Sequence, residues 1–315
     1  GLRHIAKNMA EAKVTIVLGV PLVFESMYKK IWDGIRKAEK KVRFAIKLNN
    51  VLKKFGMDKS KKMFERIHAS FGGHLRLLIS GAAAIDPEVA KGFRDLGIHF
   101  LQGYGLTECA PIVALNRDVD FKDAAAGLPM PGVDIAISNS DENGIGEIIV
   151  RGPNVMLGYY KDEAATKQVI DSNGYFHTGD LGYMDKDQFV YITGRKKNVI
   201  VTKNGKNIFP EEIEYLLLKS PYIQEVLVYA SEEEGDTIVK ANIFPDFEKI
   251  EEDFKNGVLS SDNVEAIIQS EIKNVNKQLV NYKAIKGFNI RETEFSKTTT
   301  KKIKRYVEEN KAENE

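Results

Sequence analysis

Seven consecutive residues, 102–108, bring together groups that bind nucleotides in the order Gln-Gly-Tyr-Gly-Leu-Thr-Glu. The two glycines, Gly103 and Gly105, let the backbone approach a ligand closely, and the ring of Tyr104 offers a flat face to a purine. Thr107 offers a hydroxyl to a phosphate, and Glu108 offers a hard oxygen ligand for Mg²⁺. Taken alone, the segment is equally consistent with a structural turn.

Three other short segments carry compatible chemistry. Residues 80–84 read Ser-Gly-Ala-Ala-Ala and are small enough to let a flat base lie against the backbone. Asp180 lies in a predicted tight turn, where its two oxygens could accept both hydroxyls of a ribose or could simply stabilise the turn. Arg195 supplies a planar donor suited to ribose hydroxyl or phosphate oxygens.

The elements that must position these residues change type along the chain. Strand signals at 75–79 and 98–102 flank a helix that is expected to begin near Asp86-Pro87, which predicts a βαβ unit. Short alternating strands with turn signals between 133 and 194 indicate a β-rich subdomain. We therefore expect an α/β region that continues into a β-rich subdomain.

Helical and mixed patterns occupy the two ends of the chain. Helix-like periodicity runs from about 20 to 69, before the βαβ unit. After Arg195 the pattern alternates strand, helix and strand, and apolar residues line one face of a predicted helix at 263–281. A small α+β domain is expected to close the chain.

Composition limits the classes of protein that remain. The 315 residues are 43% hydrophobic and 29% charged, and no apolar run is long enough for a membrane helix. A single cysteine, Cys109, excludes an internal disulfide and favours the cytoplasm; we interpret it as a small buried residue rather than a nucleophile. The chain starts with Gly rather than Met, and we expect a break in a longer protein at this point.

The positive charge is concentrated near the start of the chain. Residues 1–70 hold 17 Lys and Arg against 6 Asp and Glu, mostly within the helical segment 29–66. Such a segment is usually a solvated helix face, but it could also meet anionic lipid as a peripheral contact or the phosphates of a nucleotide thioester. Nucleic acid is not expected as a partner, because no reading helix or aromatic-rich basic strand accompanies the charge.

The motifs together resemble the adenylate-forming superfamily, which includes the acyl-CoA synthetases, in their order and approximate spacing along nearly the whole chain. The matching segments are 80–84, 103–108, 146–159, 175–181, 194–197 and 297–302. Segments 20–28 and 75–81 and the basic insert between them resemble the long-chain acyl-CoA synthetase branch. The resemblance implies that residues 1–194 are the carboxyl-terminal part of the large AMP-binding domain and that 195–315 form a small mobile domain.

The resemblance also implies a role for each matching residue. Gly81, Ala82 and Ala83 would line the adenine site, Tyr104 would stack on the base between Gly103 and Gly105, Thr107 and Glu108 would contact phosphate and Mg²⁺, Asp180 would hold the ribose, and Arg195 would bind ribose or phosphate. Lys197 would be the hinge of the small domain, and Gly205 would lie beside CoA.

The tail departs from the family pattern while keeping its lysine. Ser296 stands for the usual Pro, and Lys301 stands for the usual Gly. Spacing to Ile303 favours Lys302 as the lysine that catalyses adenylation, with Lys301 as its rival. A mobile ammonium suits this step because negative charge builds on the carboxylate and phosphate oxygens as pyrophosphate leaves.

The implied reaction is activation of a fatty acid by MgATP, followed by transfer of the acyl group from the adenylate to CoA. Transfer to a carrier protein uses the same first step and remains an alternative. A non-catalytic nucleotide-binding module is a second alternative, because no segment of the chain supplies the family's Ser/Thr/Gly-rich phosphate loop with its Lys. We therefore expect this chain alone to be inactive.

Overall fold

The computed structural model describes residues 5–233, 235–298 and 302–307. The chain forms two compact units, Gly1–Ile192 and Thr193–Glu315. The predicted junction between residues 194 and 195 lies on strand β9 (Val190–Arg195), where the chain passes from one unit to the next.

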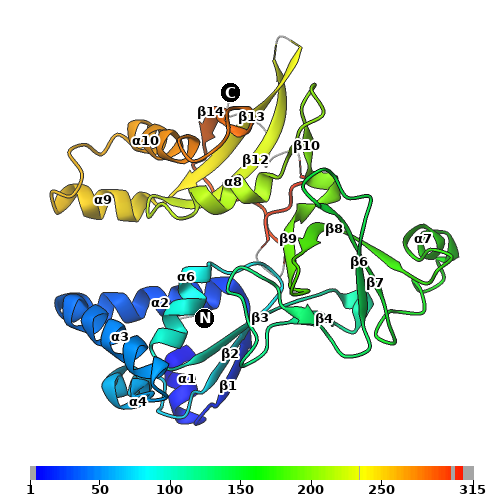
Figure 1. Ribbon diagram of the computed structural model, residues 1–315. Helices are drawn as coiled ribbons and strands as arrows, with labels where there is room; N and C mark the ends of the chain where they lie inside the picture. The colour runs from blue at the N-terminus through cyan, green and yellow to red at the C-terminus, as the bar shows by residue number, and fades with distance from the viewer. Residues whose placement is uncertain (1–4, 234, 299–301, 308–315) are drawn as a thin grey trace. The chain divides into compact units, whose positions relative to one another are not determined.

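The first unit holds two sheets and most of the helices (Figure 1). Before β9 its elements are α1 (Ile5–Glu11), β1 (Ile16–Gly19), α2 (Pro21–Ile35), η2 (Arg36–Ala38), α3 (Glu39–Lys54), α4 (Ser60–Met63), α5 (Glu65–Ser70), β2 (Leu77–Ser80), α6 (Pro87–Asp95), β3 (His99–Gly105), η3 (Thr107–Cys109), β4 (Ile112–Leu115), β5 (Leu128–Pro129), β6 (Asp134–Ser138), β7 (Gly146–Arg151), α7 (Glu163–Val169) and β8 (Phe176–Met184).

The first sheet has the strand order β1-β2-β3-β4-β5, parallel from β1 to β3 and antiparallel after that. The predicted βαβ unit is confirmed as β2, α6 and β3. Helix α6 begins where expected, because Asp86 accepts a hydrogen bond from the Glu88 amide at 2.8 Å and Pro87 occupies its first turn. Strand β1 was not predicted.

Aromatic side chains join the helices to this sheet. The rings of Phe24 on α2 and Phe93 on α6 lie 5.3 and 5.7 Å from the ring of Phe100 on β3. All three side chains are fully or almost fully buried, so they fix both helices against the strands. The run predicted as helix-like at 20–69 is divided into α2, η2, α3, α4 and α5.

The second sheet has the strand order β6-β7-β8-β9 and confirms the predicted β-rich subdomain. Its turns are stabilised by aspartates. Asp141, Asp171 and Asp185 each accept hydrogen bonds from the backbone amides two and four residues later, at 2.8–3.1 Å. Ile148, Val150, Phe176 and Val190 bury one face of this sheet.

The second unit is the predicted α+β arrangement. Its elements after β9 are η4 (Lys196–Asn198), β10 (Ile200–Val201), β11 (Asn207–Ile208), α8 (Pro210–Leu217), β12 (Ile223–Glu233), β13 (Asp236–Pro245), α9 (Phe247–Lys255), α10 (Val264–Asn276), η5 (Asn281–Lys283) and β14 (Ile285–Ile290). Strand β13 is central, antiparallel to β12 and parallel to β14. Helices α8 and α10 contribute Ile213, Leu217, Ile268 and Ile272 to its core. Among the described residues, every helix is too short or too polar to cross a bilayer.

Candidate active site

Two of the predicted nucleotide-binding segments lie next to each other at one edge of the first sheet. Strands β2 and β3 are parallel, with Ser80 paired to Gln102, so Gly81 and Gly103 are the next residues on neighbouring strands. The carboxyl edge of parallel strands is where open α/β sheets bind ligands. The two segments are separated in the sequence but lie side by side in the fold.

The small-residue segment after β2 is open to solvent. A Cβ built on Gly81 would meet no atom within 4 Å, and Ala82 and Ala83 are exposed. Ala82 has a φ of 72°, a left-handed conformation that costs a residue with a side chain of order 1 kcal/mol or more. Strain of this kind concentrates where a loop is shaped for a ligand.

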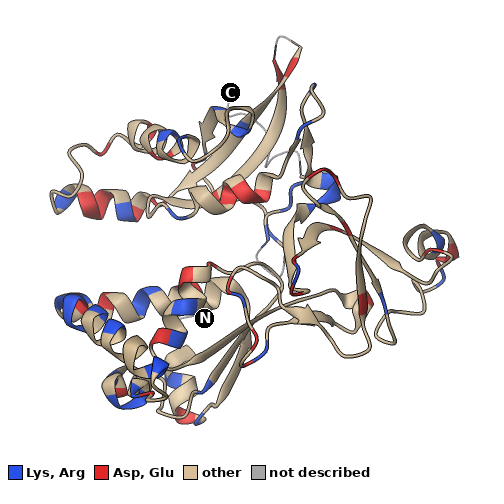
Figure 2. Cartoon of the chain, viewed as in Figure 1, with Lys and Arg blue, Asp and Glu red and all other residues tan. Residues whose placement is uncertain are grey.

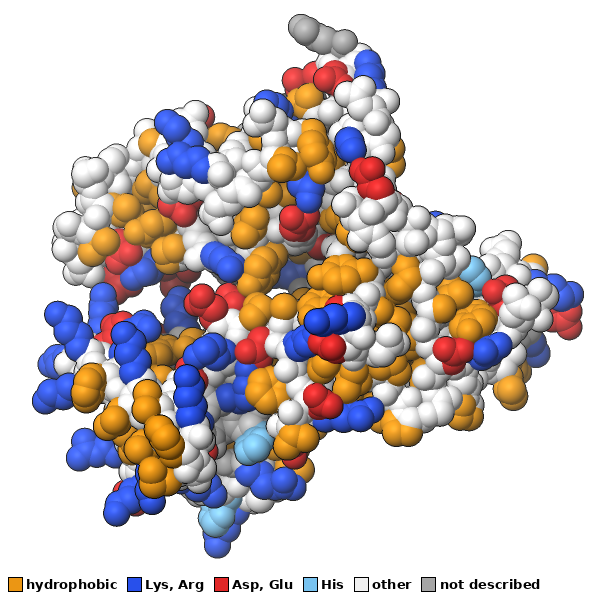
Figure 3. Space-filling model, viewed as in Figure 1, with side chains coloured by type: hydrophobic (Ala, Val, Ile, Leu, Met, Phe, Trp, Pro, Cys, Tyr) orange, Lys and Arg blue, Asp and Glu red, His pale blue; other side chains and the backbone are white. Residues whose placement is uncertain are grey.

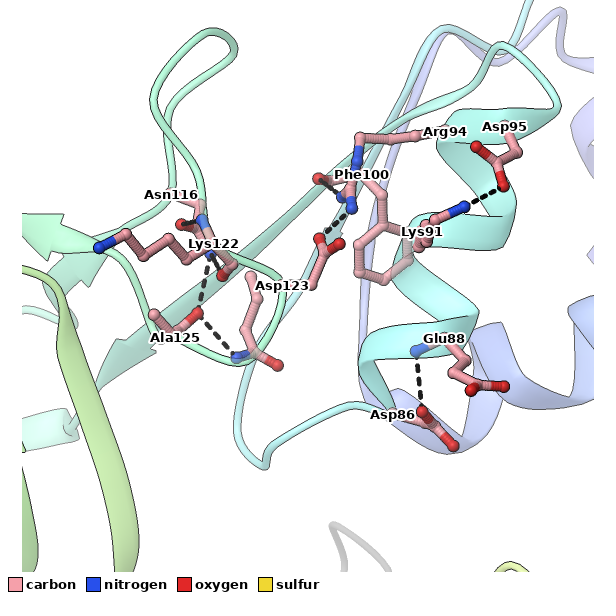
Figure 4. Close-up of polar contacts among 11 residues, drawn as sticks. Asp86, Glu88, Lys91, Arg94, Asp95, Phe100, Asn116, Lys122, Asp123 and Ala125 are labelled. Carbon is pink, nitrogen blue, oxygen red and sulfur yellow. Dashed lines mark hydrogen bonds and ion pairs between the residues drawn. The ribbon is translucent and has the colours of Figure 1, made fainter. Parts of the chain in front are cut away.

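Gln102 holds the surrounding loops in place. Its Oε1 accepts a hydrogen bond from the Ile85 amide at 2.8 Å, and its Nε2 donates to the Ala125 carbonyl at 3.0 Å. Asn116 Nδ2 also donates to the Ala125 carbonyl, and its Oδ1 accepts from the Lys122 amide (Figure 4). The loop after β4 is thereby tied to the strand that carries Gly103.

The packing of the backbone around position 105 requires a glycine there. A Cβ at this position would lie 1.9 Å from the Pro111 carbonyl oxygen, because Gly105 pairs with Ile112 where β3 turns toward β4. No other residue fits without moving the backbone. This packing accounts for the glycine whether or not a ligand approaches it.

Tyr104 connects the loop to a second predicted site residue. Its hydroxyl donates a hydrogen bond of 2.7 Å to Oδ2 of Asp180 on β8. Both side chains are buried, with exposed fractions of 8% and 6%. The family resemblance implies a separate role with the nucleotide for each residue, and nothing in the sequence indicated this bond.

Hydrogen bonds hold the part of β8 around Asp180 in place. Its amide donates to Thr178 Oγ1 at 3.0 Å, and the Thr178 hydroxyl donates to the Ile148 carbonyl at 2.7 Å. Glu147, also buried, accepts from the Gly179 amide at 3.1 Å and lies 3.3 Å from Nδ1 of His177. Glu147 was missed from the sequence, where only an acidic residue at a strand start was visible.

Glu108 is held by the segment after β7. Tyr159 donates its hydroxyl to Glu108 Oε1 at 3.1 Å, and the Met156 amide donates to the Glu108 carbonyl at 2.7 Å. Asn154 Nδ2 donates to the carbonyls of Cys109 and Ile112, each at 3.1 Å. Burial and the neighbouring Glu108 raise the pKa of Tyr159, so it stays a donor at neutral pH.

The carboxylate of Glu108 suits a magnesium ion that is shared with phosphates. Its Oε2 accepts no hydrogen bond from any residue that the structure describes, and the side chain is partly exposed. Within the described ranges no three His, Cys, Asp or Glu side chains cluster as metal ligands. Glu108 would therefore be one oxygen ligand among several from a nucleotide and water.

Cys109 is structural. It is fully buried, and burial together with Glu108 raises the pKa of its thiol to about 11. A thiol of this kind is not a nucleophile at neutral pH, which agrees with the interpretation from sequence.

Thr107 is exposed at the start of η3 in the first unit, and the remaining predicted site residues belong to the second unit. Arg195 ends β9, and Lys197 is exposed in the 3₁₀ turn η4. Gly205 lies in the turn between β10 and β11, where its φ is 70° and its amide donates to the Thr202 carbonyl at 2.9 Å. No atom lies within 4 Å of a Cβ at Gly205.

Lys302 lies next to an antiparallel bridge. Lys297 and Ile303 form an antiparallel bridge, and the Thr298 amide donates to the Lys302 carbonyl at 2.8 Å. The Lys302 side chain is exposed. Its rival, Lys301, lies outside the described residues.

Two ion pairs anchor the chain before and after Lys302 to β12 and α8, and neither was predicted from the sequence. Lys297 pairs with Glu225, whose Oε2 also accepts from the Phe295 amide at 2.9 Å. On the other side, Arg305 pairs with Glu214 and donates to the Val228 carbonyl at 3.0 Å. Lys302 is therefore held between two fixed points.

Comparison with known proteins places the chain in a family. A family model described as AMP-binding enzyme matches residues 2–160. The chain belongs to the AMP-binding enzyme family. The predicted membership of the adenylate-forming superfamily is confirmed.

Similar curated proteins carry related names. A long-chain-fatty-acid–CoA ligase of Mycobacterium bovis is 30% identical over 97% of this chain and 54% of its own length. A ligase of the same name from Escherichia coli O157:H7 is 39% identical over 53% of this chain and 30% of its own length. Long-chain-fatty-acid–CoA ligase 6 of Rattus norvegicus is 32% identical over 72% of this chain and 35% of its own length. The chain spans about half the length, or less, of these relatives.

Solved structures share the fold. The o-succinylbenzoate CoA synthetase of Bacillus subtilis in complex with an acyl-adenylate intermediate matches all of this chain and 55% of its own, with a TM-score of 0.72 and 21% identity. The same enzyme with ATP and a magnesium ion gives a TM-score of 0.70 at 22% identity, over 97% of this chain and 53% of its own. The predicted fold class is confirmed.

Proposed function

We propose that the protein containing this chain activates a long-chain fatty acid with ATP and transfers the acyl group to CoA, releasing AMP and pyrophosphate. The observation that carries the proposal is the hydrogen bond from Tyr104 to Asp180, placed beside the paired ends of β2 and β3. It joins three segments whose chemistry suits adenosine. The names of the curated relatives support a fatty acid as the substrate and CoA as the acceptor.

The first unit would bind the nucleotide. Gly81, Ala82 and Ala83 offer an open backbone surface for adenine, and the ring of Tyr104 would stack on the base. The Tyr104 hydroxyl donates to one carboxylate oxygen of Asp180 and fixes the position of this side chain, which would bind the ribose hydroxyls. Thr107 is exposed one residue before Glu108 and would donate to a phosphate oxygen. Arg195 would donate to ribose or phosphate.

Glu108 would hold Mg²⁺, and Tyr159 would orient the carboxylate. When bound, the ion neutralises phosphate charge as pyrophosphate leaves. Lys302 would donate to the developing charge on the acyl and α-phosphate oxygens. The anchors at Lys297 and Arg305 limit the entropy that is lost when Lys302 is ordered.

Thioester formation would use the second unit. Lys197, exposed in η4, would act as a hinge, and the side-chain-free surface at Gly205 would let pantetheine pass close to the backbone. CoA thiolate would attack the acyl carbonyl of the adenylate, forming the thioester bond and expelling AMP. The carbon–oxygen bond to AMP breaks as the carbon–sulfur bond forms.

The test uses the full-length protein encoded by the gene. With MgATP, CoA and a panel of short, medium and long straight-chain acids, mass spectrometry should find acyl-CoA, AMP and pyrophosphate, with long acids preferred. Transfer to a phosphopantetheinylated carrier protein but not to CoA would establish the carrier-protein alternative. Absence of adenylate with every acid, from a protein that still binds AMP, would reject the ligase in favour of a non-catalytic nucleotide-binding protein.

A further inference from the structure

An apolar stripe runs along the outer side of helix α3. The stripe consists of Phe44, Leu48 and Val51 on the helix and Phe55, which caps its end. These residues are four, three and four positions apart, so their side chains lie on the same side of the helix. Their exposed fractions are 69%, 46%, 52% and 73%. Four large apolar side chains in a line on one surface helix exceed the scattered exposure that is normal for a soluble protein.

The opposite side of α3 is fixed against the first unit, so the stripe cannot turn inward. Val42, Ala45 and Ile46 pack against the core. Asn49 is fully buried, and its Nδ2 donates to Ser60 Oγ at 2.8 Å and to Asp58 Oδ1 at 3.2 Å. These contacts set the rotation of the helix about its axis.

Basic side chains border the stripe, and no acidic residue interrupts them. Residues 40–57 contain six Lys and Arg and no Asp or Glu. Lys40, Lys47 and Lys54 are exposed and spaced by seven residues, so they form a row beside the apolar stripe. Figure 2 shows the concentration of basic residues on these helices, and Figure 3 shows apolar side chains gathered among them at the lower left.

We propose that this face of α3 docks flat on an anionic lipid bilayer. The apolar stripe enters the boundary between headgroups and acyl chains, and the row of lysines contacts the lipid phosphates. A stripe of this length covers about 16 Å along the helix axis, which suits a helix lying parallel to the surface. A single acyl chain or a single phosphate would contact only part of this face. A bilayer would contact both the apolar stripe and the row of lysines.

Charge decides against the other occupants. A second copy that docks through the same face would bring two rows of lysines together, which costs free energy. A nucleic acid would pair with the lysines but would leave Phe44 and Phe55 without apolar contacts. An anionic bilayer satisfies both sets of side chains at once. The proposal does not rest on the proposed catalytic function, because it uses none of the residues assigned to the nucleotide.

The test is flotation of the full-length protein that contains this chain, with vesicles of phosphatidylcholine alone and of phosphatidylcholine with one third phosphatidylglycerol. The protein should bind the anionic vesicles but not the neutral ones, and added salt should weaken the binding. Phe44→Ser with Phe55→Ser should lower the partition coefficient by at least about tenfold, as should Lys40→Glu with Lys47→Glu. These side chains are exposed, so circular dichroism should show an unchanged fold.

Control variants carry changes of the same kind elsewhere on the surface. Val119→Ser alters an apolar side chain that is 94% exposed, and Lys186→Glu with Lys277→Glu reverses two exposed charges. Neither should change the partition coefficient by more than about twofold. AMP binding should be unchanged in every variant, which separates this proposal from the proposed nucleotide site.

Several results would overturn the proposal. No binding to anionic vesicles, or binding that the phenylalanine variant leaves unchanged, means that the face is only a solvated charge run. Equally tight binding to duplex DNA, insensitive to the phenylalanines, means a general polyanion surface. Self-association that the phenylalanine variant abolishes, in the absence of vesicle binding, assigns the face to a second copy.

Discussion

The hydroxyl of Tyr104 donates a hydrogen bond of 2.7 Å to Oδ2 of Asp180, across 76 residues of sequence. Both side chains are buried, so the bond is shielded from water. It fixes the aromatic ring and the carboxylate as a pair, and any change to one should be felt by the other.

Tyr104→Phe should therefore weaken nucleotide binding while keeping the ring. We expect a loss of about 1–2 kcal/mol in the free energy of unfolding, because Asp180 loses a buried donor. AMP affinity, measured by calorimetry, should fall severalfold. The control is Tyr282→Phe, whose hydroxyl donates to no described residue and whose side chain is 45% exposed. Unchanged affinity in Tyr104→Phe would show that the bond does not shape the site.

Tyr159→Phe should reveal whether the hydroxyl near Glu108 serves the metal. The bond is 3.1 Å long and partly exposed, so its loss should cost about 0.5–1 kcal/mol of stability or less. In the full-length protein, the Mg²⁺ concentration for half-maximal activity should rise severalfold. Tyr160→Phe alters the neighbouring ring, which is 89% exposed, and should leave the magnesium dependence unchanged. An equal effect of both variants would assign Tyr159 no role at the metal.

Lys302→Ala should suppress acid-dependent exchange of labelled pyrophosphate into ATP by the full-length protein. We expect a reduction of about a hundredfold or more, because a donor to the developing charge is lost. Lys301→Ala is the matched control and should retain exchange. The reverse pattern would transfer the catalytic role to Lys301.

Glu214→Gln should remove a pH dependence of stability. Burial raises the pKa of Glu214 from 4.5 to about 7, although Arg305 opposes the rise. Between these values the folded chain binds more protons than the unfolded chain, so the free energy of unfolding falls as the pH rises from 4.5 toward 7. Hydrogen exchange of the α8 amides across this range should show the slope in the wild type and a flatter profile in Glu214→Gln.

The control for this titration is Glu248→Gln, which changes an exposed glutamate at the start of α9. It should keep the wild-type slope. A slope that survives in Glu214→Gln would mean that a group other than Glu214 causes the pH dependence.

Substitutions at Gly205 can separate backbone geometry from CoA binding. Gly205→Ala should cost about 1 kcal/mol because of the left-handed φ of 70°, whereas Gly205→Asn should cost less, since Asn tolerates this conformation. If pantetheine passes close to the backbone, Gly205→Asn should still raise the KM for CoA. Gly144→Ala, at an open turn with a φ of 77°, should lose similar stability without changing that KM.

The sequence predicted the parts of the fold that depend on local chemistry. Asp86-Pro87 marked the start of α6, and aspartates marked the turns of the second sheet, because their side chains bond to amides only a few residues away. The break between α2 and α3 was missed. Arg36–Ala38 contains no proline or glycine, and Gly34, two residues earlier, weakens a helix without specifying where it ends.

The candidate site was predictable as residue types but not as a network. The match to an adenylate-forming pattern selected Asp180, Glu108 and Lys302 without indicating what holds them. Their supports, Glu147 and Arg305, resemble ordinary surface charges in the sequence. Burial and distant partners distinguish them, and both depend on strand register that is fixed only when the sheets form.

The amide of Gln102 has a consequence for how this region moves. Its oxygen accepts from the Ile85 amide and its nitrogen donates to the Ala125 carbonyl. A single side chain therefore supplies the acceptor to one loop and the donor to the other. A carboxylate of the same shape could satisfy only one of them. The loops should therefore loosen together: a Gln102→Glu exchange would raise the amide exchange of both segments in parallel, making two surface loops one cooperative opening unit.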